Sequence, residues 1–369
     1  MNIHTHFLIL GAGPAGLAVA GRLRHLGRPF EIVEQHDQIA SSWRRHYDRL
    51  HLHTAKKFSA LPHMPFPDDY PQYIPKELLL GYFDRYAEHF QIRPHFGHEV
   101  LSAVREEDHW HTITSKGEFF SENLVVCTGF NRVPNMPAYP GQEHFQGTII
   151  HSSAYKNAEP FRGKSVMVVG MGNSGAEIAL DLSENGVKTY LSVRGPVNII
   201  PRDFLGRPVQ QTAMLLGKLP RWLGDRLGMI APLVAIGDLS KYGIKRLNMP
   251  PAQQLRRYGR TPVIDIGTVR QIRKGKIKVL PGVEHFTEFC AITQNGDSVE
   301  LDAIIYATGY RAALEDFLQL PPGLLNERGH PTTVHPQGPK GLYFVGFNGY
   351  SSGLLWSIYR DSQKVVISD

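Results

Sequence analysis

The chain of 369 residues has only two cysteines, Cys127 and Cys290, and it contains no C-x-x-C pair. A disulfide scaffold needs several cysteines, and a dithiol redox centre needs two close together. The sequence therefore argues against both. Cys127 follows the apolar residues Leu124-Val125-Val126, so we expect it to be a small buried core residue.

The chain also lacks an apolar run that could cross a bilayer. The longest candidate, Leu227 to Gly237, is far short of the roughly 20 residues that a spanning helix needs. A strand and a glycine loop begin so close to the N-terminus that no signal peptide fits. We therefore expect no membrane span and a cytoplasmic location.

Massed charge and metal-ligand sets are missing as well. The net charge of +6 comes from Lys and Arg spread along the chain, so anionic small molecules account for it better than nucleic acid does. The pairs His51/His53 and His109/His111 have no cysteine or acid at a recognised ligand spacing. We expect neither a nucleic-acid partner nor a metal site.

Two glycine-rich loops dominate what the sequence does contain. The first is Gly11-Ala12-Gly13-Pro14-Ala15-Gly16, after Phe7-Leu8-Ile9-Leu10, and the second is Gly170-Met171-Gly172-Asn173-Ser174-Gly175, after Val166-Met167-Val168-Val169. Each follows the order strand, tight turn, helix start, which is the context that G-x-G-x-x-G requires. A pyrophosphate binds there on the free N–H groups at the helix start. Two such loops predict two dinucleotides and electron transfer between them.

The surrounding segments repeat in the same order. A further glycine follows each loop after the same interval, at Gly27 and Gly186, and each is followed by a second strand. Each half later has a short meander, for which we expect strands at 100–114 and 119–120 and at 277–279 and 291–293. A buried strand then ends at Thr128-Gly129 and at Thr308-Gly309. The pattern predicts an α/β fold with two dinucleotide-binding, Rossmann-like domains.

The two halves differ at the end of the second strand. Glu34 stands where an acid bonds the ribose hydroxyls of a dinucleotide. The equivalent position in the second half is Val193, flanked by Ser192 and Arg194. A guanidinium binds phosphate in a fork, so this pair favours the 2′-phosphate of NADPH. The alternative is that Arg194 is a solvated charge at a strand end.

Residues 205–260 have no counterpart in the first half. We expect them to be largely helical, with an apolar face that serves core packing or a lid rather than a membrane surface. The members of this face are Leu215, Leu216, Leu219, Trp222, Leu223 and Leu227.

The segment from Phe145 to Tyr155 fits the pattern F-x-G-x-x-x-H-x-x-x-Y. It resembles the signature of class B flavin-containing monooxygenases and lies between the two glycine loops, as in that family. Other segments resemble the plant YUCCA branch, the indole-3-pyruvate monooxygenases, and their bacterial relatives: 52–58, 64–67, 170–175, 261–267, 307–310, 341–347 and 352–355. Baeyer–Villiger enzymes have Trp where this chain has Tyr155, which counts against a ring-expanding ketone oxygenase.

The resemblance implies FAD in the first site and NADPH in the second, with the NADPH domain inserted into the FAD domain. We expect an FAD-binding domain at 1–155 and 301–369, and an NADPH-binding domain at 156–300 with the helical insert. The expected cofactor-binding residues are Gly11, Gly13, Pro14, Ala15, Gly16, Glu34, Gln35, Trp43, His53, Thr128, Gly129, Gly170, Gly172, Asn173, Ser174, Gly175, Ser192, Arg194, Gly309 and Leu354. Asn173 is also the candidate catalytic residue, with helix capping as its alternative role. His151 and Tyr155 are expected to hold the linker between domains.

The family further implies a monooxygenase that forms a flavin (hydro)peroxide from dioxygen. The expected reaction is oxidative decarboxylation of an aromatic 2-oxo acid such as indole-3-pyruvate. One alternative is N- or S-oxygenation with the same cofactors. Another is a non-catalytic flavin redox sensor, against which two intact phosphate loops argue. The missing C-x-x-C argues against a disulfide reductase.

Overall fold

The computed structural model describes residues 2–336, 339–348 and 352–367. The chain forms two compact units. The first contains the chain up to Arg45, Thr54–Val133 and the chain from Tyr310 onward, and the second contains His46–His53 and Pro134–Gly309. The short strands β7 (Val133–Pro134) and β20 (Tyr310–Arg311) stand where the chain passes between units. These bounds differ from the expected 155/156 and 300/301, and the assignment of one cofactor to each unit stays a prediction.

The first unit is built on a seven-stranded sheet in the order β3-β2-β1-β6-β5-β4, with β21 also paired to β6. Its strands are β1 (Asn2–Leu10), β2 (Phe30–Glu34), β3 (His95–Phe96), β4 (Val100–Arg105), β5 (Trp110–Thr114), β6 (Gly117–Val126) and β21 (Leu342–Phe344). The expected strands at 119–120 and 124–127 are therefore one continuous strand, β6. β1 is a central strand that pairs in parallel on both sides, and Phe7–Leu10 are fully buried; since alternate side chains point to opposite faces, both faces of the sheet are covered there, which explains the unbroken apolar run.

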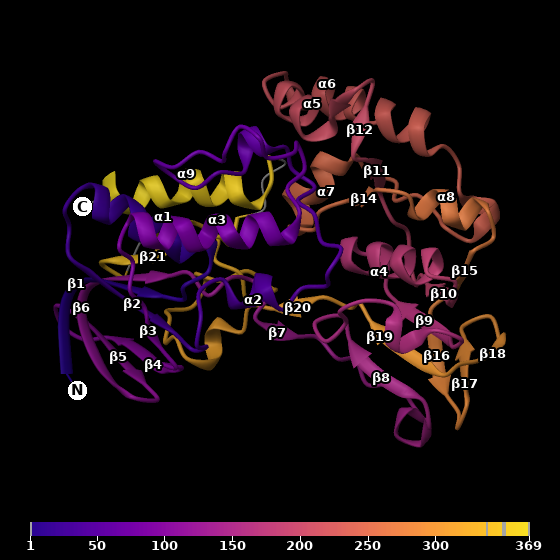
Figure 1. The fold of residues 1–369 in the computed structure, drawn as a ribbon, viewed down its shortest axis with the longest axis horizontal. Coiled ribbons are helices and arrows are strands. Elements are labelled where there is room, and N and C mark those ends of the chain that lie inside the picture. Colours follow the sequence, from indigo (N-terminus) through magenta and orange to yellow (C-terminus); the bar gives the residue numbers. More distant parts are fainter. Residues whose placement is uncertain (1, 337–338, 349–351, 368–369) are drawn as a thin grey trace. The chain divides into compact units, whose positions relative to one another are not determined.

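The helices of this unit are α1 (Pro14–His25), α2 (Ser41–Arg44), α3 (Lys76–His89) and α9 (Leu354–Ile367), with 3₁₀ turns at Lys56–Phe58 and Leu314–Asp316. Helices α3 and α9 both pack against α1 (Figure 1). Arg22 of α1 is buried and donates hydrogen bonds to Ser362 Oγ and the Tyr359 carbonyl oxygen, both at 3.0 Å. The C-terminal helix is thereby fixed against the first helix of the chain.

The second unit is built on a five-stranded parallel sheet in the order β15-β10-β9-β19-β8. Its strands are β8 (Thr148–His151), β9 (Ser165–Val169), β10 (Lys188–Ser192), β15 (Ile277–Leu280) and β19 (Ala303–Tyr306). The meander is β16 (Val283–Phe286), β17 (Cys290–Thr293) and β18 (Ser298–Glu300). The expectation that Ile277–Val279 belongs to the meander is wrong. The helix before β15 carries the chain back across the sheet, so β15 runs parallel to β10.

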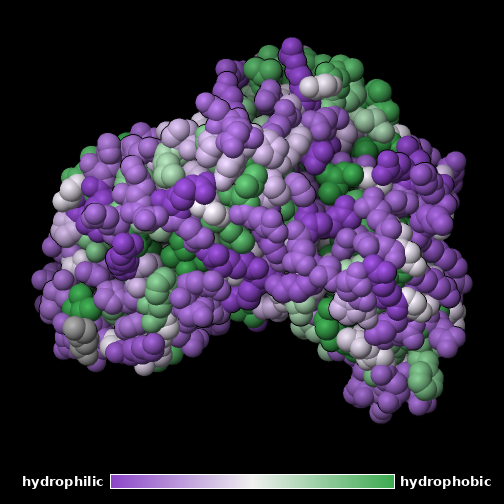
Figure 2. All heavy atoms as spheres, viewed as in Figure 1, coloured by the Kyte–Doolittle hydropathy of each residue, from purple (hydrophilic) through white to green (hydrophobic). Residues whose placement is uncertain are grey.

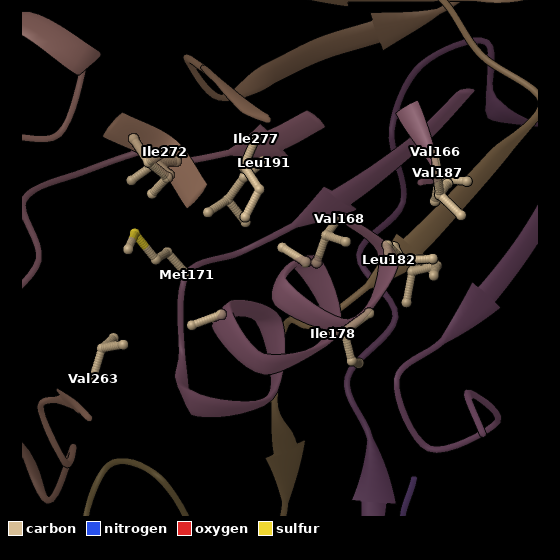
Figure 3. Close-up of a cluster of buried hydrophobic side chains, with 14 of the residues drawn as sticks. Val166, Val168, Met171, Ile178, Leu182, Val187, Leu191, Val263, Ile272 and Ile277 are labelled. Atoms are coloured by element: carbon tan, nitrogen blue, oxygen red, sulfur yellow. The ribbon is translucent and has the colours of Figure 1, made fainter. Parts of the chain in front are cut away.

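Helices α4 (Asn173–Glu184) and α8 (Thr268–Arg273) accompany this sheet, with 3₁₀ turns at Gln142–His144 and Glu159–Phe161. Figure 3 shows the core formed there, in which Val168 of β9, Leu191 of β10 and Ile178 of α4 belong to one buried cluster. The two units thus share a plan: β3-β2-β1-β6-β21 in the first corresponds to β15-β10-β9-β19-β8 in the second.

The insert continues the second unit and is largely helical, as expected. It contains α5 (Val209–Leu216), α6 (Arg221–Gly228), α7 (Pro251–Tyr258), a π-helical turn at Pro232–Ile236 and a 3₁₀ turn at Ser240–Tyr242. A hairpin of β12 (Asp203–Phe204) and β13 (Arg207–Pro208) leads into it, and β11 (Ile199–Pro201) pairs in parallel with β14 (Val263–Asp265) across its base. The apolar face of α6 does not pack in a core: the helix contains no buried residue.

Candidate nucleotide-binding sites

The first glycine loop joins β1 to α1, and its three glycines have three separate tasks. Gly11 has a φ of +101°, and a Cβ there would lie 3.1 Å from the Cys127 carbonyl oxygen. A Cβ on Gly16 would lie 1.9 Å from the Gly11 carbonyl oxygen, so only glycine lets the helix come this close. A Cβ on Gly13 would meet no atom within 4 Å. Gly13 therefore borders open space at the start of α1, where a phosphate binds.

The second loop, between β9 and α4, repeats this geometry. Gly170 has a φ of +105°, and its Cβ would lie 2.8 Å from the Ala307 carbonyl oxygen. The Cβ of Gly175 would lie 2.0 Å from the Gly170 carbonyl oxygen, and that of Gly172 would meet nothing within 4 Å. Neither α1 nor α4 has a side chain that caps its first turn. Both helix starts thus offer free N–H donors and positive dipole ends to an anion.

Glu34 ends β2 beside the first loop and is 7% exposed. Its Oε2 accepts a hydrogen bond from the Ala12 N–H at 2.9 Å, and its Oε1 accepts one from the His36 N–H at 3.0 Å. The carboxylate is therefore held in one orientation against the glycine loop. Each oxygen keeps a second lone pair for a ribose hydroxyl, so the geometry fits the expected role.

Thr128 gives a second sign of a ligand in the first unit. Its hydroxyl oxygen is buried and has no hydrogen-bond partner among the described residues. Thr128 lies beside Gly11, and its expected role in binding the dinucleotide stays a prediction. Gly129 follows with a φ of +74°.

The other expected FAD-site residues come from several elements of the first unit, and their roles stay predictions. Pro14 and Ala15 are buried in the first turn of α1, and Gln35 is exposed directly after Glu34. Trp43 of α2 meets the Phe83 ring edge-on at 6.1 Å, and Leu354 is the first residue of α9. Gly346 follows β21, and a Cβ there would lie 3.1 Å from the Ala15 Cβ, so the end of this strand packs closely against the first turn of α1.

Ser192 and Arg194, which were expected to bind a 2′-phosphate together, have different surroundings in the structure. Ser192 is buried at the end of β10, and its hydroxyl donates to the Pro281 carbonyl oxygen at 2.9 Å. Arg194, two residues later, is exposed. The expected help from Ser192 is therefore not supported, because its only proton is already used. Arg194 remains the candidate.

Asn173, the first residue of α4, does not cap its own helix. Its Oδ1 accepts a hydrogen bond from the Ile264 N–H at 2.8 Å, and its Nδ2 donates to the Pro262 carbonyl oxygen at 3.4 Å. The capping alternative is wrong, since Asn173 fixes the segment around β14 to the start of α4. Ser174 is the second residue of α4, and Gly309 follows β19 with a φ of +83°; their cofactor roles stay predictions.

His53 lies in the second unit, on the short segment His46–His53. Its Nε2 is 2.5 Å from Oε1 of Glu177, which is 2% exposed on α4. His53 Nδ1 and Glu177 Oε2 are buried without partners among the described residues. A cofactor role for His53 stays a prediction.

Three acids of α4 hold the segment His46–His53 in place, and sequence reasoning missed them. Arg49 Nη1 contacts Asp181 Oδ1 at 3.3 Å and Glu184 Oε2 at 3.0 Å, beside the His53–Glu177 contact. Glu177, Asp181 and Glu184 share one helix face because they are four and three residues apart. This spacing in the sequence indicates an acidic helix face, although it does not show which segment that face contacts.

The F-x-G-x-x-x-H-x-x-x-Y segment is structural in its contacts. A Cβ on Gly147 would lie 2.5 Å from the Phe145 ring. His151 Nε2 donates to the Gly309 carbonyl oxygen at 3.1 Å, while Nδ1 accepts from the Ser153 N–H. Burial lowers the pKa of His151. The Tyr155 hydroxyl donates to Asp181 Oδ2 at 2.6 Å, and burial raises the pKa of that hydroxyl. The signature thus joins β8, the end of β19 and α4 within the second unit.

Within the described residues, no group of three or more His, Cys, Asp or Glu side chains is placed to hold a metal ion. Burial raises the pKa of the Cys127 thiol. Over the same part of the chain, no helix is long and apolar enough to cross a membrane.

The model of the flavin-binding monooxygenase-like family matches residues 29–320. The chain is 40% identical over 352 residues to the probable indole-3-pyruvate monooxygenase YUCCA9 of Arabidopsis thaliana, covering 92% of this chain and 83% of the relative. It is 40% identical over 370 residues to the indole-3-pyruvate monooxygenase YUCCA8 of Oryza sativa subsp. indica, covering 94% and 87%.

Solved structures agree on the fold. A mutant of a flavin monooxygenase from Stenotrophomonas maltophilia has a TM-score of 0.75 at 20% identity, covering 99% of this chain and 98% of the other. An oxidized steroid monooxygenase bound to NADP has a TM-score of 0.74 at 18% identity, covering 99% and 84%.

Proposed function

Because the chain belongs to the flavin-binding monooxygenase-like family, we propose that it oxidatively decarboxylates an aromatic 2-oxo acid, with indole-3-pyruvate as first choice. The observation that carries this proposal is the 40% identity to indole-3-pyruvate monooxygenases over 92% of the chain. The enzyme is a monooxygenase with FAD and NADPH as cofactors.

The site residues fit these two cofactors. The N–H groups at the start of α1, the fixed Glu34 carboxylate and the unpartnered Thr128 hydroxyl would hold FAD. The start of α4 and Arg194 would hold NADPH. When bound, the flavin accepts a hydride from NADPH and activates dioxygen; the protein supplies orientation, electrostatics and exclusion of water.

The proposed reaction balances with these reactants. The 2-oxo acid, NADPH, a proton and dioxygen give the acid shortened by one carbon, carbon dioxide, NADP⁺ and water. The bond between the ketone carbon and the carboxyl carbon breaks, and one atom of dioxygen enters the new carboxylate. The other atom leaves as water with the two electrons of NADPH.

The test is simultaneous measurement of NADPH, dioxygen, carbon dioxide and indole-3-acetate with indole-3-pyruvate as substrate. We expect NADPH and dioxygen to be consumed in the same amounts in which carbon dioxide and indole-3-acetate are formed. The rate of NADPH oxidation should fall when the keto acid is left out. Phenylpyruvate, trimethylamine and a thioether are the comparison substrates. Ready oxygenation of the amine or thioether, with no carbon dioxide from either keto acid, would instead identify an N- or S-oxygenase. NADPH use that no substrate stimulates would favour the redox sensor.

A further inference from the structure

The helical insert exposes large apolar side chains that the structure leaves uncovered. Eight lie between residues 205 and 234: Leu205, Leu215, Leu219, Trp222, Leu227, Ile230, Leu233 and Val234. Leu205 is 86% exposed, Val234 70% and Trp222 64%. Figure 2 shows apolar residues gathered at the top of the view, where Figure 1 places α5 and α6. A surface of this kind marks an interaction site.

The insert is a built structure rather than a loose loop. Helices α5 and α6 approach so closely that a Cβ on Gly224 would lie 2.7 Å from the Leu216 carbonyl oxygen. At the base, buried Asn198 donates to Met249 O at 2.7 Å and to Gln254 Oε1 at 2.9 Å. Arg246 donates to the Gly237 carbonyl oxygen at 2.7 Å. The apolar side chains are therefore exposed on an anchored support.

The charge of the insert is strongly one-sided. Residues 205–260 contain ten Lys and Arg against two acids, a net charge of +8, whereas the rest of the chain has 30 basic and 32 acidic residues. Both acids are already engaged: Asp225 pairs with Arg256 at 2.6 Å, and Asp238 accepts from the Ser240 N–H and hydroxyl. Lys218, Arg221 and Arg226 are exposed among the apolar side chains.

We propose that the insert docks on the surface of a bilayer that contains anionic lipids, without spanning it. The exposed apolar side chains, Trp222 among them, enter the boundary between headgroups and acyl chains, while Lys and Arg pair with lipid phosphates. Two copies of an insert with a net charge of +8 repel each other, which disfavours self-association through this face. Nucleic acid gives no burial to eight apolar side chains. An anionic bilayer offers partners for both the apolar side chains and the positive charge.

The first experiment measures co-sedimentation of the FAD-loaded enzyme with vesicles. We expect binding to vesicles of equal phosphatidylglycerol and phosphatidylcholine, and much weaker binding to phosphatidylcholine alone. Half-molar NaCl should weaken the first because it screens the charges. Equal binding to both vesicles, or to neither, would overturn the proposal.

The second experiment uses matched pairs of variants. Trp222→Ser with Leu233→Ser removes exposed apolar groups, and we expect a loss in partition of about tenfold. Arg221→Gln with Arg226→Gln should lower it roughly 30-fold. These are exposed positions, so folding and NADPH oxidation should stay at the wild-type level.

The controls carry the same changes elsewhere. Leu101→Ser with Ile113→Ser changes exposed apolar residues of the first unit, and Lys274→Gln with Lys276→Gln removes two exposed charges outside the insert. Both should bind vesicles as the wild type does. Similar losses in test and control variants would show that the insert is not the docking surface. Analytical ultracentrifugation completes the set: a dimer that the Trp222 variant abolishes, without vesicle binding by the wild type, would assign this face to a second copy of the chain.

Discussion

The two glycine loops have the same backbone but different surroundings. Gly11 and Gly170 have φ values of +101° and +105°, and Gly16 and Gly175 approach the preceding loop to within about the same distance. The helix faces that follow differ. Arg22 of α1 and Asp181 of α4 follow the first glycine of their own loop by the same number of residues, and they carry opposite charges. Arg22 holds α9, whereas Asp181 holds Tyr155 and Arg49. Positive φ angles and close backbone approach account for the glycines that the two loops share, whereas the residues further along each helix differ because each unit packs different neighbours against it.

The largest expected effect comes from filling the open position in each loop. Gly13 and Gly172 have extended backbones, with φ of −74° and −92°, that any residue adopts. Valine at either position therefore leaves the fold intact but fills the space that a pyrophosphate needs. We expect Gly13→Val to yield a colourless protein without FAD. Gly172→Val should stay yellow but no longer be reduced by NADPH.

The measurements are the flavin content after denaturation and the rate of flavin bleaching by NADPH without oxygen. Each variant controls for the other, and circular dichroism should match the wild type in both. Extraction of FMN from the wild type would contradict the assignment of FAD. The same defect in both variants would contradict the assignment of one nucleotide to each loop.

The next prediction concerns the difference at the strand ends. A hydrogen bond to a charged group contributes roughly 1.5–3 kcal/mol, so Arg194→Ala should weaken NADPH binding about ten- to a hundredfold. NADH binding should hardly change. Titration of both nucleotides against the oxidised enzyme measures this. Ser192→Ala is the control, since its buried hydroxyl faces Pro281. Equal losses for NADPH and NADH would show that Arg194 does not bind the 2′-phosphate.

The sequence predicted the features that depend on local backbone geometry and missed those that depend on contacts between residues far apart along the chain. The glycine loops, the Thr-Gly strand ends and the parallel sheets depend on local backbone demands, which spacing reveals. The partners of Asn173 and His53 lie 91 and 124 residues away along the chain, and no local pattern names them. Ser192 was misjudged for the same reason, because its direction depends on Pro281 beside it in the fold. The insert's apolar face was recognised, but spacing alone does not distinguish a buried stripe from an exposed one.

A smaller effect should come from the hydroxyl that anchors the signature segment to α4. Tyr155→Phe leaves Asp181 Oδ2 without its donor, so the free energy of unfolding should fall by about 1–3 kcal/mol. Urea unfolding followed by circular dichroism measures the change. Tyr139→Phe is the matched control, because the Tyr139 hydroxyl has no hydrogen-bond partner in the part of the chain that the structure describes. An unchanged unfolding midpoint for Tyr155→Phe would mean that this bond contributes nothing to the second unit.

The smallest expected effect is a pH dependence from His151. Burial lowers its pKa in the folded state, so between the folded value and about 6.5 the unfolded chain binds more protons. The stabilisation that comes from a neutral His151 is therefore fully present above about pH 6.5, and it is lost progressively as the pH falls from there toward the folded pKa. His151→Gln keeps a donor for Gly309 and an acceptor for Ser153 but has no such titration. The difference in unfolding free energy between wild type and variant, measured from pH 8 to pH 5, isolates His151 from the other histidines. It should be flat above pH 7 and change in favour of the variant below it; a difference that stays constant across the range would contradict a buried, neutral His151.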